Sequence, residues 1–368
     1  MCTICAYLFN SMVSTTVLLR NSPHSNQEKP MRAIGYQTPL PIDAATSLVD
    51  IELHGLQPSG HDVLVAVEAI SVNPVDVKVR ASSAPPAGEW KVLGWDAAGT
   101  VLATGPEATR LRPGDRVYYA GDITRPGTYA ALHCVDERLV GHMPASLDFA
   151  QAAALPLTAI TAWEALFDRL DVRRPVPGAA SALLIIGGAG GVGSIATQLA
   201  RQLTGLTVIA TASRPETRDW VQRMGAHHIL DHSQPLAPQL QALGLGAPAF
   251  VFSTTQTARH LADIAELIAP QGRFALIDDP KQLDIMAFKR KSVSVHWEFM
   301  FTRSMFATAD LAEQGRLLDE VARRVDAGQL KTTLNTRLGP IDAATLKRAH
   351  ALVETGSSIG KVVVEGWE

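Results

Sequence analysis

The chain has 368 residues, a length that predicts two domains rather than one small module. Its 33 Lys and Arg against 36 Asp and Glu give a formal net charge of −3, so no global charge attracts nucleic acid or an anionic membrane surface. A composition of 46% hydrophobic and 19% charged residues excludes a disordered chain and permits a sizeable core. Three cysteines are too few for a disulfide framework, which favours a reducing compartment, the cytoplasm.

Residues 1–30 differ in composition from the rest and are expected to be a disordered extension. Their apolar runs are far shorter than the ~20 residues that span a bilayer, and they lack the basic start, apolar centre and cleavage site of a secretory signal. Cys2 and Cys5 have the spacing of a redox or zinc pair, yet no second cysteine pair completes a four-ligand site. Patterned sequence begins at Met31, which is a candidate start of the folded protein.

Short apolar segments separated by glycine and proline turns follow, from residue 31 to about residue 156. Such spacing predicts the strands of a β-rich, partly antiparallel domain. The clearest candidate strands lie within residues 63–67, 99–104 and 113–119.

From about residue 181 the pattern of apolar residues predicts alternating strands and helices, which is the element order of a doubly wound parallel sheet. Strands are predicted at 182–186, 207–211, 249–252 and 273–277, and helices at 194–203, 215–224 and 257–268. The remaining chain predicts helices at 309–327 and 343–354 and a terminal strand at 361–365. The sequence therefore predicts an α/β protein with a β-rich part and a parallel-sheet part.

A glycine-rich loop follows the predicted strand at 182–186 directly and leads into the next helix. Gly188, Gly190 and Gly193 fit the pattern G-x-G-x-x-G, with Gly191 and Val192 between them. In this pattern the glycines permit a tight turn, a close approach of backbone to a pyrophosphate and close packing of helix on strand, while the helix N-terminus offers free N–H groups to the anion. Because both flanking elements are present, the loop predicts a dinucleotide site.

The second strand of this unit ends without the Asp or Glu that binds the ribose of NAD. Ser213 and Arg214 stand there instead, and a hydroxyl and a guanidinium can bind a 2′-phosphate, which favours NADP(H) as the cofactor. The alternative is a solvated arginine at a helix start with a capping serine. His232 is a further candidate at the adenosine end, or else a surface histidine.

With these motifs, residues 31–368 resemble the medium-chain dehydrogenase/reductase superfamily, in its quinone oxidoreductase-like or zinc-type alcohol dehydrogenase-like branch. The matching stretches are the glycine loop and residues 71–78, 93–99, 113–117 and 152–163. The resemblance implies a discontinuous GroES-like catalytic domain of residues 31–160 and 304–368 and a Rossmann NADP(H)-binding domain of residues 161–303. It also implies a cleft between the domains and, commonly, a homodimer.

Zinc-dependent members of this superfamily carry a cysteine after the first catalytic strand, a Gly-His-Glu motif and often a four-cysteine loop. At the corresponding places this chain has Asp76 and Gly94-Trp95-Asp96, and Cys134 is its only cysteine beyond residue 5. A catalytic zinc needs about three protein ligands and a structural zinc needs four. We therefore expect no zinc site of the family type; a site built from other His and Asp residues is the alternative.

Without zinc, the oxidation of a plain alcohol lacks its main stabiliser of alkoxide charge. A quinone or an α,β-unsaturated carbonyl is already electrophilic and can accept hydride from NADPH when hydrogen-bond donors stabilise its oxygen. The expected function is thus a zinc-independent NADPH-dependent quinone or enone oxidoreductase. Asn73, Asp76 and Lys78 are its catalytic candidates, with Asn73 and Lys78 binding or polarising the acceptor oxygen.

Other interpretations of the same residues stay open. The segment from Asn73 can be a structural turn in which Asp76 caps a helix, and Lys78 can be a solvated lysine. At the level of function, the alternatives are a zinc-type alcohol dehydrogenase and an NADPH-binding protein without significant turnover that acts through protein interaction.

Four further residues are candidates for cofactor contacts. Thr158 and Lys361 match positions that approach the nicotinamide and the cofactor phosphate in relatives, and a helix-start role competes for Thr158. Leu276 and Ile277 end a predicted parallel strand, where ligands bind. The aromatic segment 296–301 can form a flat apolar wall for a ring substrate, part of a subunit interface, or part of the core. The basic run 289–291 indicates a solvated loop rather than a nucleic-acid contact.

Overall fold

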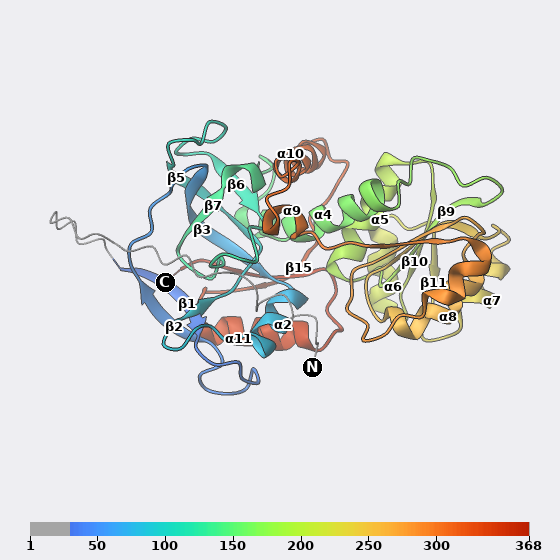
Figure 1. The fold of residues 1–368 in the computed structure, drawn as a ribbon, viewed down its shortest axis with the longest axis horizontal. Coiled ribbons are helices and arrows are strands. Elements are labelled where there is room, and N and C mark those ends of the chain that lie inside the picture. The colour runs from blue at the N-terminus through green and yellow to red at the C-terminus, as the bar shows by residue number, and fades with distance from the viewer. Residues whose placement is uncertain (1–29, 368) are drawn as a thin grey trace.

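The computed structural model describes residues 30–367, and the predictions for the preceding extension, including Cys2 and Cys5, lie outside the described residues. The described chain folds into two parts that lie side by side along the long axis of the molecule (Figure 1). One part holds a mixed sheet built from both ends of the chain, and the other holds a parallel sheet built from its middle. This arrangement confirms the predicted α/β fold with a β-rich part and a doubly wound part.

The mixed sheet has the strand order β15-β16-β3-β5-β6-β8, with β7 paired to β3. Its strands are β3 (Asp62–Val72), β5 (Ala97–Thr104), β6 (Arg116–Tyr119), β7 (Leu132–Asp136), β8 (Val140–His142), β15 (Leu334–Leu338) and β16 (Lys361–Glu365). Alternate residues are buried over the first part of β3, as the period of a strand requires, and its last four residues are all buried. Because β16 runs antiparallel to β3 with Val362 opposite Val72, the C-terminal strand carries Lys361 to the end of β3.

A small sheet and several helices complete this part. The small sheet has the order β2-β1-β4 and contains β1 (Met31–Tyr36), β2 (Val49–Leu53) and β4 (Lys91–Val92). The helices are α2 (Pro74–Ser82), α3 (Phe149–Ala153), α10 (Glu313–Asp326), α11 (Ala343–Glu354) and the 3₁₀ helix η1 (Glu137–Leu139). Helix α10 begins later than the predicted residue 309 because the preceding residues form turns, in which the Leu311 N–H donates to the Thr308 carbonyl.

The parallel sheet has the order β11-β10-β9-β12-β13-β14. Its strands are β9 (Ala180–Ile186), β10 (Thr207–Thr211), β11 (His228–Leu230), β12 (Pro248–Ser253), β13 (Arg273–Leu276) and β14 (Ser294–Trp297). The helices are α5 (Gly191–Leu203), α6 (Pro215–Arg223), α7 (Leu236–Ala242), α8 (Thr257–Leu267) and the 3₁₀ helix η3 (Ile285–Lys291). Leu183 and Ile185 of β9 join one apolar cluster and Leu184 and Ile186 join another, so the central strand is buried on both faces.

Two segments connect the parts. α4 (Pro156–Trp163) and the π-helix η2 (Glu164–Arg169) lead from the mixed sheet to the parallel sheet, and α9 (Thr302–Met305) lies on the return path. α4 packs against α5, the helix that follows the glycine loop. The junction of the two parts therefore lies beside the predicted cofactor loop. None of the helices within residues 30–367 is long and apolar enough to cross a membrane.

Candidate active site

The glycine loop lies between β9 and α5, and close packing explains its glycines. A Cβ on Gly188 would lie 2.8 Å from an alanine Cβ on β10, and one on Gly193 would lie 2.2 Å from the Gly187 carbonyl oxygen. At Gly190, by contrast, the nearest atom to such a Cβ is 3.7 Å away. No described side chain caps the first turn of α5, where Val192 is half-buried. The loop thus leaves the N–H groups of this turn available to an anion.

At the predicted adenosine end, a histidine orients a serine hydroxyl. Ser213 Oγ lies 3.2 Å from His232 Nε2, and His232 Nδ1 lies 3.1 Å from Thr211 Oγ1. Burial lowers the pKa of the His232 ring, the Asp231 carboxylate opposes that shift, and the charges of Arg259 and Arg214 lower the pKa further. The ring therefore stays neutral near pH 7, and the positive potential around it comes from the two arginines.

Arg214 stands immediately before α6, at the edge of this site. Its guanidinium donates to the Ser357 carbonyl at 2.7 Å and pairs with Glu216 at 3.2 Å, and the side chain is 44% exposed. Arg218, which the sequence interpretation missed, lies one helical turn further along α6; the spacing i, i+4 is the signal that could have found it. These side chains add positive charge beside Ser213.

The segment before β16 joins the glycine loop to the other part of the molecule. The Gly360 N–H donates to the Ala189 carbonyl at 2.8 Å. A Cβ on Gly191 would lie 2.8 Å from Lys361 Cδ and 3.0 Å from Thr158 Cγ2, so these two side chains flank the loop. The structure thus brings together three predicted cofactor residues that lie far apart in the sequence.

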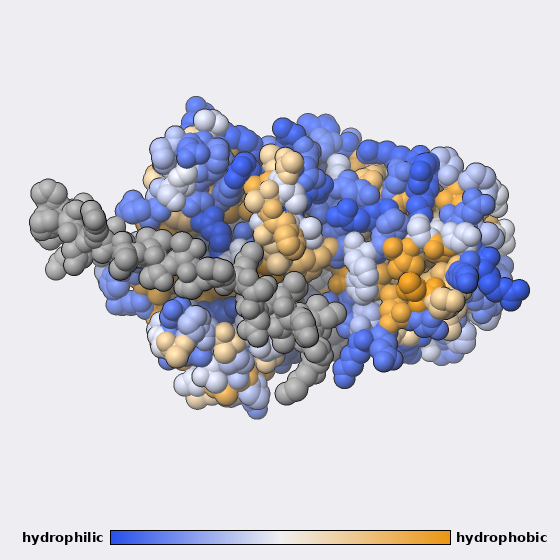
Figure 2. Space-filling model, viewed as in Figure 1, coloured by the Kyte–Doolittle hydropathy of each residue, from blue (hydrophilic) through white to orange (hydrophobic). Residues whose placement is uncertain are grey.

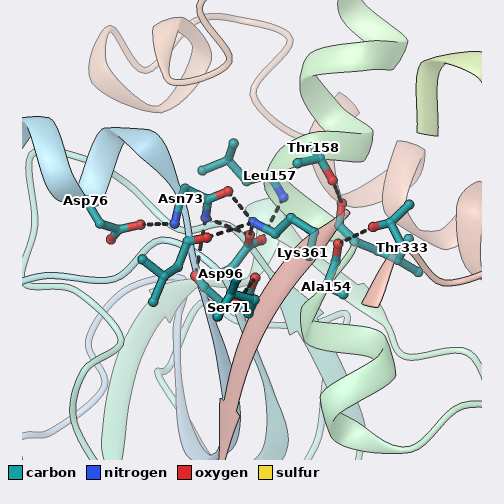
Figure 3. A network of polar contacts seen from close by, with 12 residues as sticks. Ser71, Asn73, Asp76, Asp96, Ala154, Leu157, Thr158, Thr333 and Lys361 are labelled. Atoms are coloured by element: carbon teal, nitrogen blue, oxygen red, sulfur yellow. Dashed lines mark hydrogen bonds and ion pairs between the residues drawn. The ribbon is translucent and has the colours of Figure 1, made fainter. Parts of the chain in front are cut away.

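A buried polar cluster, the lysine triad, is formed by Lys361, Asp96 and Asn73 (Figure 3). Lys361 Nζ lies 3.0 Å from Asp96 Oδ2, donates to Asn73 Oδ1, and lies 3.4 Å from the Val72 carbonyl oxygen. Asn73 Nδ2 donates to Asp96 Oδ2 at 2.8 Å, and the Leu157 N–H donates to Asp96 Oδ1 at 2.8 Å. Burial raises the pKa of Asp96, and the Lys361 ammonium opposes that shift. Each charge of the triad is therefore paired and hydrogen-bonded, as buried charges require.

Asp76 lies behind Asn73 in the first turn of α2. Its Oδ2 accepts the Asn73 N–H at 2.7 Å, so the carboxylate caps the helix, in line with the structural interpretation of this segment. Its Oδ1 is buried without a well-formed hydrogen bond. Burial raises the pKa of Asp76 to about 7, against the opposing effects of the Asn73 N–H and the Lys361 charge. A catalytic role for Asp76 stays a prediction.

Lys78 makes its contact away from the lysine triad. Its Nζ lies 2.8 Å from Asp279 Oδ2, and both side chains are about half exposed. Asp279 follows β13, so the ion pair spans the two parts of the molecule. The buried Leu276 ends the same strand and Ile277 follows it, at the carboxyl edge where parallel sheets bind ligands.

Comparison with known proteins gives the family. An alcohol dehydrogenase GroES-like domain matches residues 59–145, and a zinc-binding dehydrogenase domain matches residues 224–364. A zinc-type alcohol dehydrogenase-like protein of Staphylococcus aureus (strain MSSA476) is 38% identical over 336 residues, which cover 91% of this chain and 99% of the relative. The chain belongs to the medium-chain dehydrogenase/reductase superfamily.

Solved structures of the superfamily share this fold. A crystal structure from Rhizobium etli CFN 42, provisionally named a zinc-dependent alcohol dehydrogenase protein, is 66% identical with a TM-score of 0.91 over 93% of this chain and 99% of that one. A quinone oxidoreductase of Pseudomonas syringae pv. Tomato DC3000 is 25% identical with a TM-score of 0.76 over 91% of this chain and 100% of that one.

Membership confirms that the two parts are a GroES-like domain and a Rossmann-like cofactor domain, although the exact boundaries stay predictions. It also makes the chain an oxidoreductase of a superfamily that uses a nicotinamide cofactor. The glycine loop and its free N–H groups fit the pyrophosphate of such a cofactor.

The zinc in the names of these relatives does not fit the donors that residues 30–367 present. Both oxygens of Asp96 already accept hydrogen bonds, Trp95 offers an indole N–H that donates to the Asp122 carbonyl at 3.3 Å, and Asp76 caps α2. No three His, Cys, Asp or Glu residues of the described chain gather where they could hold a metal ion. A catalytic zinc needs about three such ligands, so this site lacks the donor set for one.

Proposed function

We propose that this protein is a zinc-independent reductase that transfers hydride from NADPH to a quinone or an α,β-unsaturated carbonyl compound. The observation that carries the proposal is the lysine triad: the buried positive charge beside the glycine loop is the Lys361 ammonium, held by Asp96 and Asn73. The Asp96 oxygens and the Asn73 side chain are already bonded within this cluster, so they are not free to ligate a Lewis-acid metal, on which alcohol oxidation depends. An acceptor that is already electrophilic needs only hydrogen-bond donors for its developing oxygen charge.

The bound nicotinamide cofactor supplies the hydride, and the chain's own residues bind and orient the reactants. Thr158 and Lys361 flank the glycine loop, and Leu276 and Ile277 lie at the carboxyl edge of β13. We assign these four residues to the nicotinamide and phosphate ends of the cofactor. We assign Val192, which is half-buried in the first turn of α5, to the same cofactor surface.

NADP(H) is the proposed cofactor because the adenosine end is positively charged. Ser213 and the partly exposed Arg214 stand where a ribose-binding carboxylate would mark an NAD site, and Arg218 lies one turn away. Arg214 has Glu216 as an ion-pair partner, and an incoming 2′-phosphate would replace that exposed pair with a charged hydrogen bond.

The two residues considered for binding the acceptor, Lys78 and Asn73, differ in the bonds that each would have to break to reach it. Lys78 would exchange an exposed ion pair with Asp279, which costs little in water. Asn73 would have to leave the buried bonds to Asp96 and Lys361. We therefore propose that Lys78 reaches the acceptor oxygen and that Asn73 is a positioning residue that holds the triad.

We also propose a homodimer formed through β14. This strand is at the edge of the parallel sheet, paired only with β13 among the described strands. Trp297 and Phe299 at its end are 53% and 46% exposed, and Figure 2 shows apolar residues gathered on the face that overlies the parallel sheet. A strand at the edge of a sheet with exposed aromatic side chains beside it favours pairing with a second copy. Sedimentation velocity should find a dimer that Trp297→Glu weakens; a wild-type monomer at all concentrations would refute this.

The test of the function is NADPH oxidation by chelator-treated protein, followed by absorbance across a panel of quinones and enones. Turnover with at least one acceptor class, unchanged by added zinc, is expected. Tight NADPH binding with no oxidation across the panel would favour a binding protein, and stoichiometric zinc needed for alcohol oxidation would favour an alcohol dehydrogenase.

The cofactor preference has its own test. Arg214→Ala should weaken NADPH binding by ~1–3 kcal/mol and leave NADH binding nearly unchanged, since a hydrogen bond to a charged phosphate is lost. Arg316→Ala, an exposed arginine on α10, is the matched control. Equal losses for the two cofactors would refute the role of Arg214.

A further inference from the structure

Trp220 of α6 is a buried residue whose indole contacts the start of α5. It is 7% exposed, and its Nε1–H donates to Ser194 Oγ at 2.8 Å. Ser194 is fully buried, and its hydroxyl donates to the Gly190 carbonyl at 2.6 Å. A serine hydroxyl has one hydrogen and two acceptor positions, so Ser194 gives its hydrogen to the glycine loop and accepts the indole N–H. Trp220 thereby fixes the direction in which this hydroxyl points.

The Ser194 hydroxyl holds a peptide plane of the glycine loop. The Gly190 carbonyl accepts both this hydroxyl and the Ser194 backbone N–H, the latter at 2.9 Å. Because a trans peptide is planar, its N–H points away from its carbonyl, so the fixed Gly190 carbonyl fixes the direction of the Gly191 N–H. Gly191 is the first residue of α5, where N–H groups have no partner within the helix and can bind an anion. The chain of hydrogen bonds thus runs from Trp220 to an N–H of the proposed pyrophosphate site.

The Trp220 ring also lies against the segment that carries Lys361. A Cβ on Gly360 would lie 2.8 Å from Trp220 Cζ2, so the ring packs on the glycine backbone. The Gly360 N–H donates to the Ala189 carbonyl at 2.8 Å, and Gly190 and Gly360 form a parallel β-bridge. Gly360 is therefore held between the indole and the glycine loop, and the next residue is Lys361 of the lysine triad.

Helix α6 contacts this segment at a second point. Arg214, immediately before the helix, donates to the Ser357 carbonyl at 2.7 Å. Arg223, in the last turn of the helix, places its guanidinium 5.5 Å from the centroid of the Trp220 ring. Residues 357–361 lead into β16 of the mixed sheet, whereas α6 belongs to the parallel-sheet part. The helix therefore joins the two parts of the molecule along the glycine loop.

We propose that Trp220 is a positioning residue for the cofactor. Its indole N–H orients the Ser194 hydroxyl that holds the Gly190 peptide, and its ring seats Gly360 so that residues 357–361 stay on the glycine loop. This inference rests on the proposed function, in that it needs a nicotinamide cofactor at the loop. It applies to NADPH and NADH alike, because the loop binds the pyrophosphate that both carry.

The test measures NADPH and NADH affinity by isothermal titration calorimetry, together with the thermal unfolding midpoint, on the full chain. Trp220→Phe keeps a ring and removes the N–H, and it should weaken both cofactors about fivefold, the effect of one lost hydrogen bond between neutral groups. Trp220→Leu also removes the ring from Gly360 and should weaken them further. Trp367→Phe is the matched control: its indole N–H donates to the Val67 carbonyl of β3 at 2.9 Å, so the same substitution there should leave both affinities unchanged.

A double variant decides whether Trp220 acts through Ser194. Ser194→Ala breaks the same chain of hydrogen bonds from the other side and should weaken both cofactors at least as much as Trp220→Phe. If the two residues act as one unit, the double variant of Ser194→Ala and Trp220→Phe should bind no more weakly than Ser194→Ala alone. Losses that multiply in the double variant would overturn this link.

The remaining outcomes separate the positioning role from the proposed function. A Trp220→Phe variant with a lower unfolding midpoint and wild-type affinity would leave Trp220 purely structural, and equal affinities for Trp220→Phe and Trp220→Leu would remove the role of the ring at Gly360. A wild-type protein that binds neither cofactor would refute the proposed function and the positioning role together. A wild type that prefers NADH would contradict only the preference assigned to Arg214.

Discussion

Replacing Lys361 by methionine removes the positive charge of the lysine triad and keeps most of the side chain volume. Asp96, which is fully buried, would lose the 3.0 Å ammonium contact and retain the N–H donors of Asn73 and Leu157. Breaking a buried ion pair from one side costs about 3–5 kcal/mol; because two of three donors remain on Asp96, we expect a loss of about 3 kcal/mol. The assay is the free energy of unfolding in urea, with Lys281→Met, an exposed lysine, as control.

A second variant makes this prediction specific to the charge. Adding Asp96→Asn to Lys361→Met removes the uncompensated carboxylate, so the double variant should be more stable than Lys361→Met alone. Burial raises the pKa of Asp96, and without the ammonium its protonation becomes easier still, so the single variant should lose least at low pH. A Lys361→Met variant within about 0.5 kcal/mol of the wild type would refute the reasoning.

The remaining predictions concern other features of the site. Gly193→Ala should abolish measurable cofactor binding or destabilise the fold, because its Cβ would lie 2.2 Å from a backbone oxygen. Gly205→Ala is the control and should be neutral, because a Cβ there would meet no atom within 4 Å. Thermal unfolding and cofactor titration compare the two variants. Lys78→Ala should lower kcat/KM and change the free energy of unfolding by less than about 1 kcal/mol, because its ion pair with Asp279 is exposed. Asp279→Asn should leave kcat/KM unchanged. Equal kcat/KM values for the wild type and both variants would show that Lys78 does not act on the acceptor. Because the pKa of Asp76 is raised from 3.8 to about 7, the wild type should lose stability as the pH rises through that range. Asp76→Asn cannot titrate there and should lack this loss. Parallel curves of unfolding free energy against pH for the two proteins would contradict the prediction.

Local signals predicted the central elements of the cofactor domain but not β11, α7 and β14. The strand Thr207–Thr211 has the predicted bounds, as does the helix Ala343–Glu354 in the GroES-like domain. The helix after the glycine loop begins at Gly191 rather than residue 194 because the loop itself forms its first turn. Such elements are predictable because their apolar period and turn residues lie within one short segment.

The lysine triad depends on contacts that no local pattern contains. Asn73 and Lys361 are 288 residues apart, and they meet because β16 pairs with β3. The resemblance indicated both residues as candidates without indicating their contact. At Asp96 the sequence indicates only a departure from the zinc motif, although this carboxylate receives three hydrogen bonds in the fold.

The central claim is hydride transfer without a metal, and isotope transfer tests it most directly. Metal-stripped protein is incubated with NADPH deuterated at the transferred position of C4 and with a quinone or enone that it reduces. With an enone we expect one deuterium on the reduced carbon, and with a quinone we expect stoichiometric oxidation of the labelled cofactor with a primary isotope effect. Both rates should be the same with and without added zinc. Turnover that appears only after zinc is restored, or product without label or isotope effect, would contradict it.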